Sequence, residues 1–352
     1  MIGGNLRRVL APLLLCVLTA TAAQADDSWQ VQNRLQGKLK KDEPQKAEDV
    51  SGVACAPGAL PRVCLVVDDE SQGAQVVVVK QNLLLAGDFI DLIDAEYDGK
   101  KLELDAEGVA YADGFFYVAG SQGRARHEDD ANKEARNLAK AAETRKIFRI
   151  ALAPEAVDPE TGMLNGTPLV DTSTALAKLL QTDPVLAASF DRPLDKNGLT
   201  VEGIAVRGAN LYAALRGPVL DDGSAVIARM PLAAVFDGAP GAVTLFRVDL
   251  GKDTQGDPRG IRDITASGEG FLLIAGPVED PPKKHKVAVG DYAIYAWNEG
   301  DAVKRLDLLP YGKKVKPEAL VILSADAENA HALLMFDGAK EGQPTPVDIP
   351  MQ

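Results

Sequence analysis

The chain has 352 residues, with 38 Lys and Arg against 51 Asp and Glu, so its formal charge is −13 near neutral pH. This excess of negative charge repels polyanions, and we therefore expect no binding of nucleic acid. The same surface tolerates cationic partners and divalent metal ions.

The N-terminus has the pattern of an export signal. Arg7 and Arg8 precede an apolar run over residues 9–23, and Ala23-Gln24-Ala25 has the small-x-small pattern of a cleavage site. The run is shorter than the ~20 residues that a helix needs to cross a membrane. We therefore predict a signal peptide over residues 1–25 and a periplasmic or secreted mature chain. Because no later apolar run approaches that length, we predict no membrane span.

Residues 26–49 are predicted to precede the main domain, with a strand near 29–35 and a charged, flexible connector over 38–49. Directly after them, Cys55 and Cys64 flank a turn rich in Pro and Gly. Such a turn places the two thiols opposite each other on a hairpin. Because exported proteins fold in an oxidising compartment, we predict a disulfide; two buried free thiols are the alternative.

One phrase recurs along the rest of the chain. Residues 51–54, 107–110 and 202–205 read S-G-V-A, E-G-V-A and E-G-I-A, and residues 262–265 and 318–321 are degenerate copies. A short apolar run follows each phrase, and these second strands are predicted at 63–67, 115–119, 210–215, 271–275 and 332–336. Third and fourth strands are predicted at 75–80 and 83–90, 146–152 and 167–171, 225–232 and 243–250, and 292–298 and 303–309. Four short strands per ~50–60 residues are typical of a β-propeller blade.

These repeats predict an all-β, single-domain β-propeller over residues 50–352, with five blades of four-stranded antiparallel sheets. A sixth blade in the long interval between the second and third copies is the alternative. In that interval, an apolar stripe at Ala131, Ala135, Leu138 and Ala142 predicts a helical insertion over residues 128–146. The last blade has only two clear strands, so we expect residues 29–35 to complete it and to close the ring.

The repeated phrase also predicts how the first strand packs. Its second and fourth positions are small in the three best copies, whereas its third position is a branched apolar residue in every copy. Because alternate residues of a strand face opposite sides, one face of this strand is flat and the other is bulky. Such a strand suits a sheet that is pressed between two neighbours.

In a propeller, the start of each inner strand and the end of the next strand lie at one mouth of the central channel. We expect the ligand-binding candidates there to be Glu107, Glu202, Glu318, Arg216, Arg259, Arg262, Asp263, Ser121 and Arg124. A mixed ring of carboxylates and arginines suits a small polar or anionic ligand, such as a sugar-like or phosphorylated compound, or a divalent cation. The structural alternative is that the recurrent Glu residues accept backbone N–H groups, and that Arg262 and Glu202 form a buried ion pair.

Asp68, Asp69 and Glu70 form the densest acidic run beside a strand end, and Ca²⁺ is the cofactor that such a run suggests. The run lacks the D-x-D-x-D-G spacing of a calcium loop. The G-S-Q-G sequence around Ser121 differs from the G-x-S-x-G elbow, so no serine nucleophile is predicted.

Three segments carry a family resemblance: E-G-V-A-Y-A-D-G-F-F-Y-V-A-G-S at 107–121, E-G-I-A-V-R-G-A-N-L-Y-A-A-L-R-G-P at 202–218 and G-I-R-D-I-T-A-S-G-E-G-F-L-L-I-A-G-P at 260–277. Together they resemble an exported bacterial family known as domain of unknown function 3616, over roughly residues 50–337. That family is in turn distantly similar to the phytase-like propellers, which share E-G-[IV]-A strand starts and are linked to esterase or phosphatase activity. The likeness implies that Glu107, Glu202 and Glu318 line the ligand site. The chain departs from that pattern where R-D replaces E-G at 262–263.

Three functional hypotheses follow. In the first, the chain is an exported binding module whose charged channel mouth holds a small polar ligand or an extracytoplasmic partner. In the second, it is a phytase-like phosphoesterase in which a carboxylate-bound cation activates water. In the third, it is a structural scaffold that contacts partner proteins through its blade sides or its helical insertion.

Overall fold

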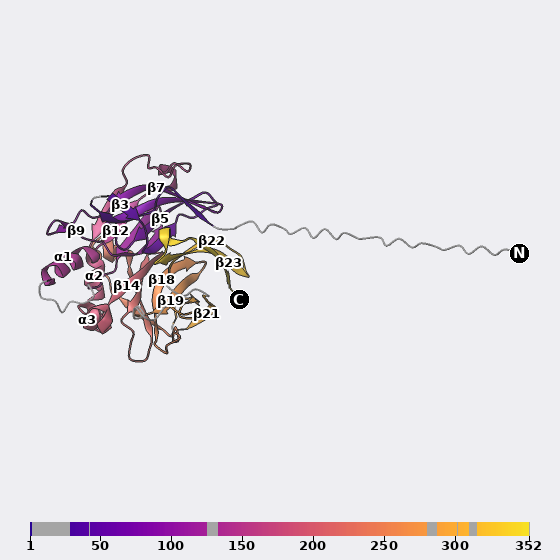
Figure 1. The fold of residues 1–352 in the computed structure, drawn as a ribbon. Helices are drawn as coiled ribbons and strands as arrows, with labels where there is room; N and C mark the ends of the chain where they lie inside the picture. The colour runs from indigo at the N-terminus through magenta and orange to yellow at the C-terminus, as the bar shows by residue number, and fades with distance from the viewer. Residues whose placement is uncertain are drawn as a thin grey trace.

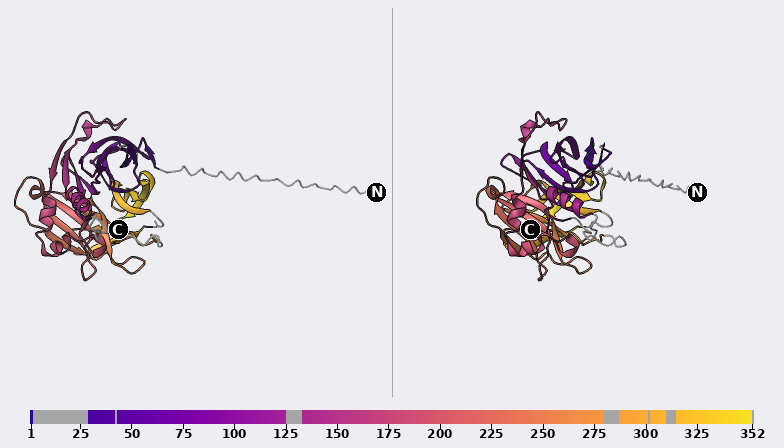
Figure 2. Two further views of the ribbon diagram at one scale, coloured as in Figure 1. Left: turned by 60° about the vertical axis from the view of Figure 1, so that its left-hand side comes forward. Right: turned by 90° about the vertical axis from the view of Figure 1, so that its left-hand side faces the viewer.

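The computed structural model describes Met1 and residues 29–41, 43–124, 133–279, 287–300, 302–309 and 315–351. The body of the molecule is a ring of five small antiparallel sheets, which follow one another around the ring in chain order (Figures 1 and 2). Apart from Met1, the predicted signal peptide lies outside the described residues, and so does the start of the predicted helical insertion.

Each sheet contributes one inner strand to the wall of a shared channel. The inner strands are β4 (Val50–Cys55), β10 (Ala106–Ala112), β14 (Thr200–Arg207), β18 (Arg259–Ser267) and β22 (Lys316–Ala325). Each contacts the next one along the chain, and β22 contacts β4. A small cavity of about 120 Å³ is lined by residues from all five strands, so they surround one axis. The prediction of a five-bladed propeller is therefore confirmed.

The outer strands follow each inner strand in chain order. They are β5 (Arg62–Asp68), β6 (Gly73–Lys80) and β7 (Leu83–Asp91); β11 (Phe115–Gly120), β12 (Ile147–Ala151) and β13 (Leu169–Ser173); β15 (Asn210–Gly217), β16 (Ala225–Pro231) and β17 (Thr244–Val248); β19 (Gly270–Pro277), β20 (Ala293–Trp297) and β21 (Val303–Leu308); and β23 (Asn329–Asp337) and β24 (Thr345–Pro350). The predicted second, third and fourth strands agree with these bounds to within about three residues. Short apolar runs bounded by turn residues were enough to predict these strands.

The last blade differs from its prediction. Its third strand is β24, which pairs antiparallel with β23, and the sheet has three strands. The N-terminal strand β1 (Gln30–Gln32) pairs parallel with β7 at the outer edge of the first blade, so the prediction that it completes the last blade is wrong. Pro346 and Pro350 concealed β24, because proline is tolerated in an edge strand but weakens the sequence signal of a strand.

The predicted flexible connector is also wrong in part. Residues 36–46 form a hairpin of β2 (Gln36–Lys40) and β3 (Glu43–Lys46), and a second small hairpin joins β8 (Glu96–Tyr97) and β9 (Lys100–Lys101). The first hairpin lies at the seam between the first and last blades, where Lys46 pairs with Glu341 at 2.8 Å. Contact with the last blade gives this charged segment a fixed place.

Within the described segments, no strand is shared across the seam that closes the ring. Instead, Arg62 Nη1 donates to the carbonyl of Ile322 at 2.7 Å, and the amides of Gly338 and Glu341 donate to the carbonyls of Glu48 at 2.8 Å and Ala47 at 2.7 Å. Apolar packing adds to these bonds, because a buried cluster that includes Val66, Val77, Leu333 and Met335 joins the two blades.

The other blade interfaces have the same apolar construction. Among the described residues there are five buried clusters, one between each pair of adjacent blades. The predicted disulfide is present and links Cys55 to Cys64 at paired positions of β4 and β5.

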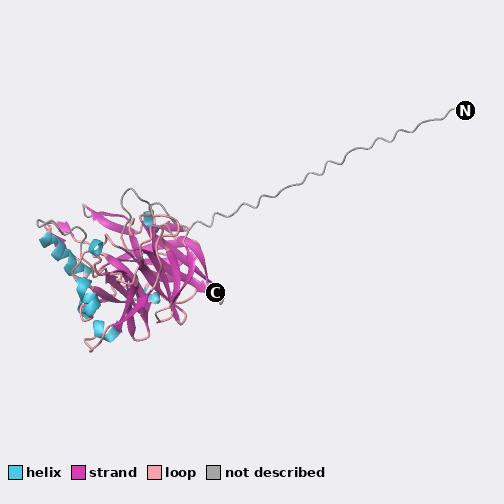
Figure 3. Cartoon of the chain, turned by 90° about the horizontal axis from the view of Figure 1, so that it is seen from below, coloured by secondary structure: helices cyan, strands magenta, loops and turns pink. Residues whose placement is uncertain are grey.

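Helices lie in the connections between strands and gather mostly at one side of the molecule (Figure 3). The helix α1 (Glu134–Thr144) occupies the predicted insertion, and α2 (Ala175–Leu180) follows in the same long interval between the second and third copies of the repeated phrase. Two further helices, α3 (Pro184–Phe190) and α4 (Leu232–Phe236), and the short 3₁₀ segments η1 (Pro154–Ala156), η2 (Leu194–Lys196) and η3 (Lys340–Gly342) were not predicted. Within the described part of the chain, no helix is long and apolar enough to cross a membrane.

The small residues of the repeated phrase face the neighbouring blade. A Cβ atom placed on Gly108 would lie 2.6 Å from the amide nitrogen of Ile204, and one placed on Gly203 would lie 2.8 Å from that of Ile264. Both glycines therefore allow adjacent inner strands to approach closely near the axis. This contact explains the flat face that the sequence predicted.

Candidate functional site

All five inner strands carry a β-bulge near their beginning, one to three residues after the first residue of the strand. In each pairing with the second strand the register shifts by one residue, and the unpaired residues are Ser51, Glu107, Glu202, Arg262 and Glu318. A bulge redirects the side chain of its extra residue, which explains why five side chains from five blades can converge. All five are buried, with exposed fractions between 1% and 8%.

Arg262 lies between two glutamates of this ring. Its Nη2 contacts the carboxylate of Glu318 and lies 3.3 Å from Glu202 Oε2. The other oxygen of Glu202 lies 3.3 Å from Arg216 Nη1, and Arg216 Nε donates to the carbonyl of Val278 at 2.6 Å. The buried Arg262–Glu202 ion pair of the structural alternative is therefore present. Arg262 Nε and Nη1 find no acceptor among the described residues.

Glu107 belongs to the same group, but it forms no ion pair with an arginine or lysine of the described residues. One carboxylate oxygen each of Glu107, Glu202 and Glu318 lies within 4.8 Å of the others. In the described part of the chain, Glu107 has neither a hydrogen-bond partner nor an ion-pair partner. Burial, and then the negative charge of Glu202, raise the pKa of Glu107 well above its ordinary value.

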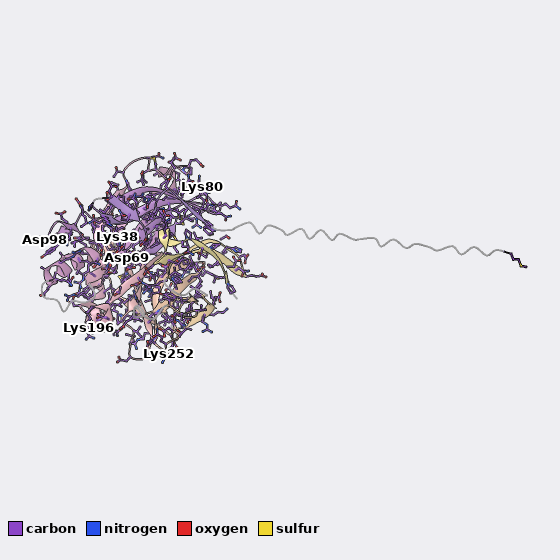
Figure 4. The ribbon with its side chains drawn as sticks, viewed as in Figure 1. Lys38, Asp69, Lys80, Asp98, Lys196 and Lys252 are labelled. Carbon is purple, nitrogen blue, oxygen red and sulfur yellow. A yellow bond between two sulfur atoms is a disulfide. The ribbon has the colours of Figure 1, made fainter. Side chains whose placement is uncertain are left out.

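A cavity of about 430 Å³ lies over this group, at the mouth of the channel. Every blade contributes to it. Its charged lining comprises eight acidic and five basic residues, namely Asp49, Asp69, Glu70, Asp105, Glu107, Glu202, Glu318 and Asp337, with Arg124, Lys140, Arg216, Arg262 and Lys316. In the view of Figure 4, Asp69 lies over the middle of the molecule, whereas Lys80 and Lys252 lie at its periphery.

The charges of this cavity are only partly paired. Lys140 lies 3.3 Å from Asp105 Oδ1, and Lys316 contacts Asp337. Among the described residues, Asp49 and Asp69 have no such cation, and Asp69 Oδ1 is buried without a hydrogen-bond partner. Burial is the main cause that raises the pKa of both carboxyls. The negative charge of Asp337 raises the pKa of Asp49 further, to about 8. The negative charge of Asp105 likewise raises the pKa of Asp69 further.

The structure separates the residues that the sequence placed at the mouth. Seven of them line the cavity: Glu107, Glu202, Glu318, Arg216, Arg262, Ser121 and Arg124. Arg259 does not, because its guanidinium donates to the carbonyls of Asp291 at 2.8 Å, Leu250 at 3.0 Å and Gly290 at 2.6 Å. Ser121 Oγ hydrogen-bonds the Asp105 carboxylate at the cavity wall.

Asp263 does not line the cavity either; its carboxylate forms hydrogen bonds at the interface between two blades. It takes the place that glycine has in the first three copies, and its carboxylate accepts hydrogen bonds from the amides of Ile264 and Leu320, each at 2.8 Å. The second of these bonds links the fourth blade to the fifth. Burial raises the pKa of Asp263 to about 7, from an ordinary value of about 3.9.

This raised pKa predicts that the fold is less stable at alkaline pH. A folded carboxyl that binds its proton more tightly than the unfolded one contributes stability in full below about pH 4, and loses it as the pH rises through about 7. The shift of about three pKa units corresponds to about 4 kcal/mol, at about 1.4 kcal/mol per unit. We therefore expect Asp263→Asn to remove a fall of this size in the unfolding free energy between about pH 4 and about pH 8. Urea unfolding of both proteins across this range measures the effect, and equal slopes would contradict it.

In the described part of the chain, the carboxylates of the acidic run 68–70 are not among those whose oxygens converge on one point. The Asp68 carboxylate accepts from the amides of Asp49 at 3.1 Å and Glu70 at 3.2 Å, and Glu70 pairs with Lys38 at 2.6 Å. Only Asp69 and Glu70 of the three line the cavity. Among the described residues, the acidic group whose oxygens converge is instead Glu107, Glu202 and Glu318.

Eight cavity residues were not among the candidates, and four of them share a simple relation to the repeat. They lie two residues before a bulge, and they are Asp49, Asp105, Thr200 and Lys316. Because residues two apart in an extended strand face the same side, the repeat alignment contained the signal that would have found them.

Comparison with known proteins identifies the family. The family model described as "Protein of unknown function (DUF3616)" matches residues 64–346, so the chain belongs to this family. No curated protein matches the sequence.

Among solved structures, YCF48 from Cyanidioschyzon merolae is 10% identical, with 84% of this chain and 66% of that chain covered and a TM-score of 0.35. Bacteroides ovatus xyloglucan PUL GH43B is 11% identical, with coverage of 82% and 49% and a TM-score of 0.39. The GH43 endo-arabinanase from Bacillus licheniformis is 8% identical, with coverage of 86% and 94% and a TM-score of 0.37. The chain thus spans less than two thirds of the first two proteins. Likenesses of this size say nothing about activity.

Proposed function

We propose that this chain is an exported binding protein that captures a small polar ligand in the cavity at its channel mouth. The observation that carries the proposal is the cavity of about 430 Å³ on which charged side chains from all five blades converge. Its volume falls in the range of small-molecule sites, roughly 300–1,000 Å³. The predicted signal peptide and the Cys55–Cys64 disulfide support export, since disulfides persist in oxidising compartments.

The charge balance of the cavity supports a ligand that carries positive charge or many hydrogen-bond donors. Eight acidic residues face five basic ones, and the carboxyls of Asp49, Asp69 and Glu107 have no cationic partner in the described part of the chain. Complementary charge favours binding, and like charge opposes it. Of the ligands that the sequence left open, a phosphorylated compound is therefore the least favoured.

A metal-assisted phosphoesterase is the second candidate, because three carboxylate oxygens converge within 4.8 Å. A divalent cation would be held by these three carboxylates, and their negative charge would have to be available to balance its positive charge. Arg262 already contacts Glu202 and Glu318, so two of the three carboxylates have a cation from the chain itself. This arrangement supports binding over metal-assisted hydrolysis.

Three ligands with one carbon skeleton test the proposal: glucosamine, glucose and glucose 6-phosphate, measured by thermal unfolding. We expect glucosamine to raise the Tm most and glucose 6-phosphate least. At a hundredfold excess over Kd, binding contributes about 2.7 kcal/mol, which corresponds to a rise in Tm of roughly 5 °C.

Two substitutions make the test specific to the cavity. Asp69→Asn removes a cavity carboxylate and should reduce the shift, whereas Asp98→Asn changes an exposed turn and should not (Figure 4). A larger shift with glucose 6-phosphate than with glucosamine would contradict the charge argument, and no shift with any of the three would contradict the proposal.

A further inference from the structure

The order of residues around the ring of bulges decides which carboxylate is left without a cation. Going around the channel, the bulge residues are Ser51, Glu107, Glu202, Arg262 and Glu318. Arg262 contacts both of its neighbours on this ring, Glu202 and Glu318. The neighbours of Glu107 are Ser51 and Glu202, neither of which is a cation.

Charge counting gives the same answer. The buried group contains three carboxylates and two guanidiniums, since Arg216 pairs with Glu202. Among the residues that the structure describes, one negative charge remains without a partner, and it belongs to Glu107, which is 8% exposed and lines the cavity. An unpaired buried carboxylate is costly, so a group in this position holds a proton or faces a positive charge.

We infer that Glu107 anchors the positive charge of the ligand, and that the arriving cation takes the place of a proton on Glu107. The inference rests on the proposed function. It adds the residue that binds the ligand and the sign of the ligand's charge, which the proposed function left open. On binding, the Glu107 carboxyl loses its proton to the buffer and pairs as a carboxylate with the cation. A protonated amine and a divalent metal ion both have this chemistry.

The groups around Glu107 explain why a proton and a cation compete there. Burial raises the pKa of Glu107 most, Glu202, Asp69 and Asp105 raise it further, and Arg262 acts in the opposite direction. Lys140 is already paired with Glu103 and Asp105. The charged and titratable groups that face this position are thus Glu202, Glu318, Asp49, Asp69, Asp105, Lys140, Arg216 and Arg262.

Isothermal titration calorimetry with Ca²⁺ and with putrescine tests the inference, because both keep their charge between about pH 5 and about pH 8. Titrations at one pH in two buffers of different ionisation enthalpy report the number of protons released. We expect about one proton released per bound cation, and an affinity that rises about tenfold per pH unit while Glu107 is protonated. Binding of Ca²⁺ alone would identify a metal site, and binding of putrescine alone would identify an amine site.

The variant Glu107→Gln should lose both the binding and the proton release. Glu341→Gln is the matched control, since Glu341 is also 8% exposed but does not line the cavity. Binding without proton release, or binding that survives in Glu107→Gln, would overturn this inference and leave the proposed function standing. If neither cation binds, the inference is overturned, and the glucose series decides separately whether the cavity binds small ligands.

Discussion

Replacing Gly108 with alanine is expected to lower the free energy of unfolding by about 3 kcal/mol, at the upper end of the cost of overpacking. The new Cβ would lie 2.6 Å from the amide nitrogen of Ile204, which belongs to the neighbouring inner strand. A backbone atom in a sheet cannot move aside as the end of a flexible side chain can. The two strands must therefore separate, and the apolar contacts between their blades weaken with them.

Urea unfolding measures this effect, and Gly300→Ala is the control. The Cβ of the control would meet its nearest atom, the amide nitrogen of Ala302, at 3.9 Å, which is an ordinary contact. We expect the control to change stability by less than about 0.5 kcal/mol. Equal stabilities of the two variants would mean that the inner strands have room between them, and the close approach near the axis would be disproved.

The repeated phrase predicted the fold well because its small residues are required by the close contact between adjacent inner strands. A strand that approaches its neighbour through small residues and packs a branched residue on the other side leaves a pattern that recurs once per blade, at Val53, Val109, Ile204, Ile264 and Leu320. Strand alternation supplied most of the rest. The edges of the propeller lacked such a signal. The prolines in β24 weakened one strand, and nothing in the residues of β1 distinguished pairing with β7 from pairing with the last blade.

The site was harder to predict, because charge alone does not show where a side chain hydrogen-bonds. Arg259 and Arg262 are three residues apart in one strand, yet the first is bound by backbone carbonyls and the second by glutamates of two other blades. The difference comes from the bulge at Arg262, which turns its side chain toward the axis. A bulge depends on the pairing of two strands, so the sequence of one strand does not reveal it.

Replacing Arg262 with methionine should cost about 3–5 kcal/mol of stability, which is the typical result of breaking a buried ion pair by removing one partner. Methionine fills much of the same volume, so the loss is mainly electrostatic. It would leave the carboxylate of Glu318 unpaired, as that of Glu107 already is, and would deprive Glu202 of one of its two arginines. Urea unfolding at about pH 7 measures the loss.

The pH dependence of that loss separates charge from packing. Without Arg262, the buried carboxyls bind protons more tightly than in the unfolded chain, so stability is retained at acidic pH and lost as the pH rises through their folded pKa values. We therefore expect Arg262→Met to be nearly as stable as the parent at about pH 5 and much less stable at about pH 8.

Arg259→Met is the matched control. The Arg259 guanidinium donates hydrogen bonds to neutral carbonyls, so its loss should cost the same stability at both pH values. Adding Glu318→Gln to Arg262→Met should recover part of the lost stability, since it removes one of the unpaired charges. An Arg262→Met variant whose deficit is the same at both pH values would show that Arg262 acts by filling space, and the assignment of the uncompensated charge to Glu107 would lose its basis.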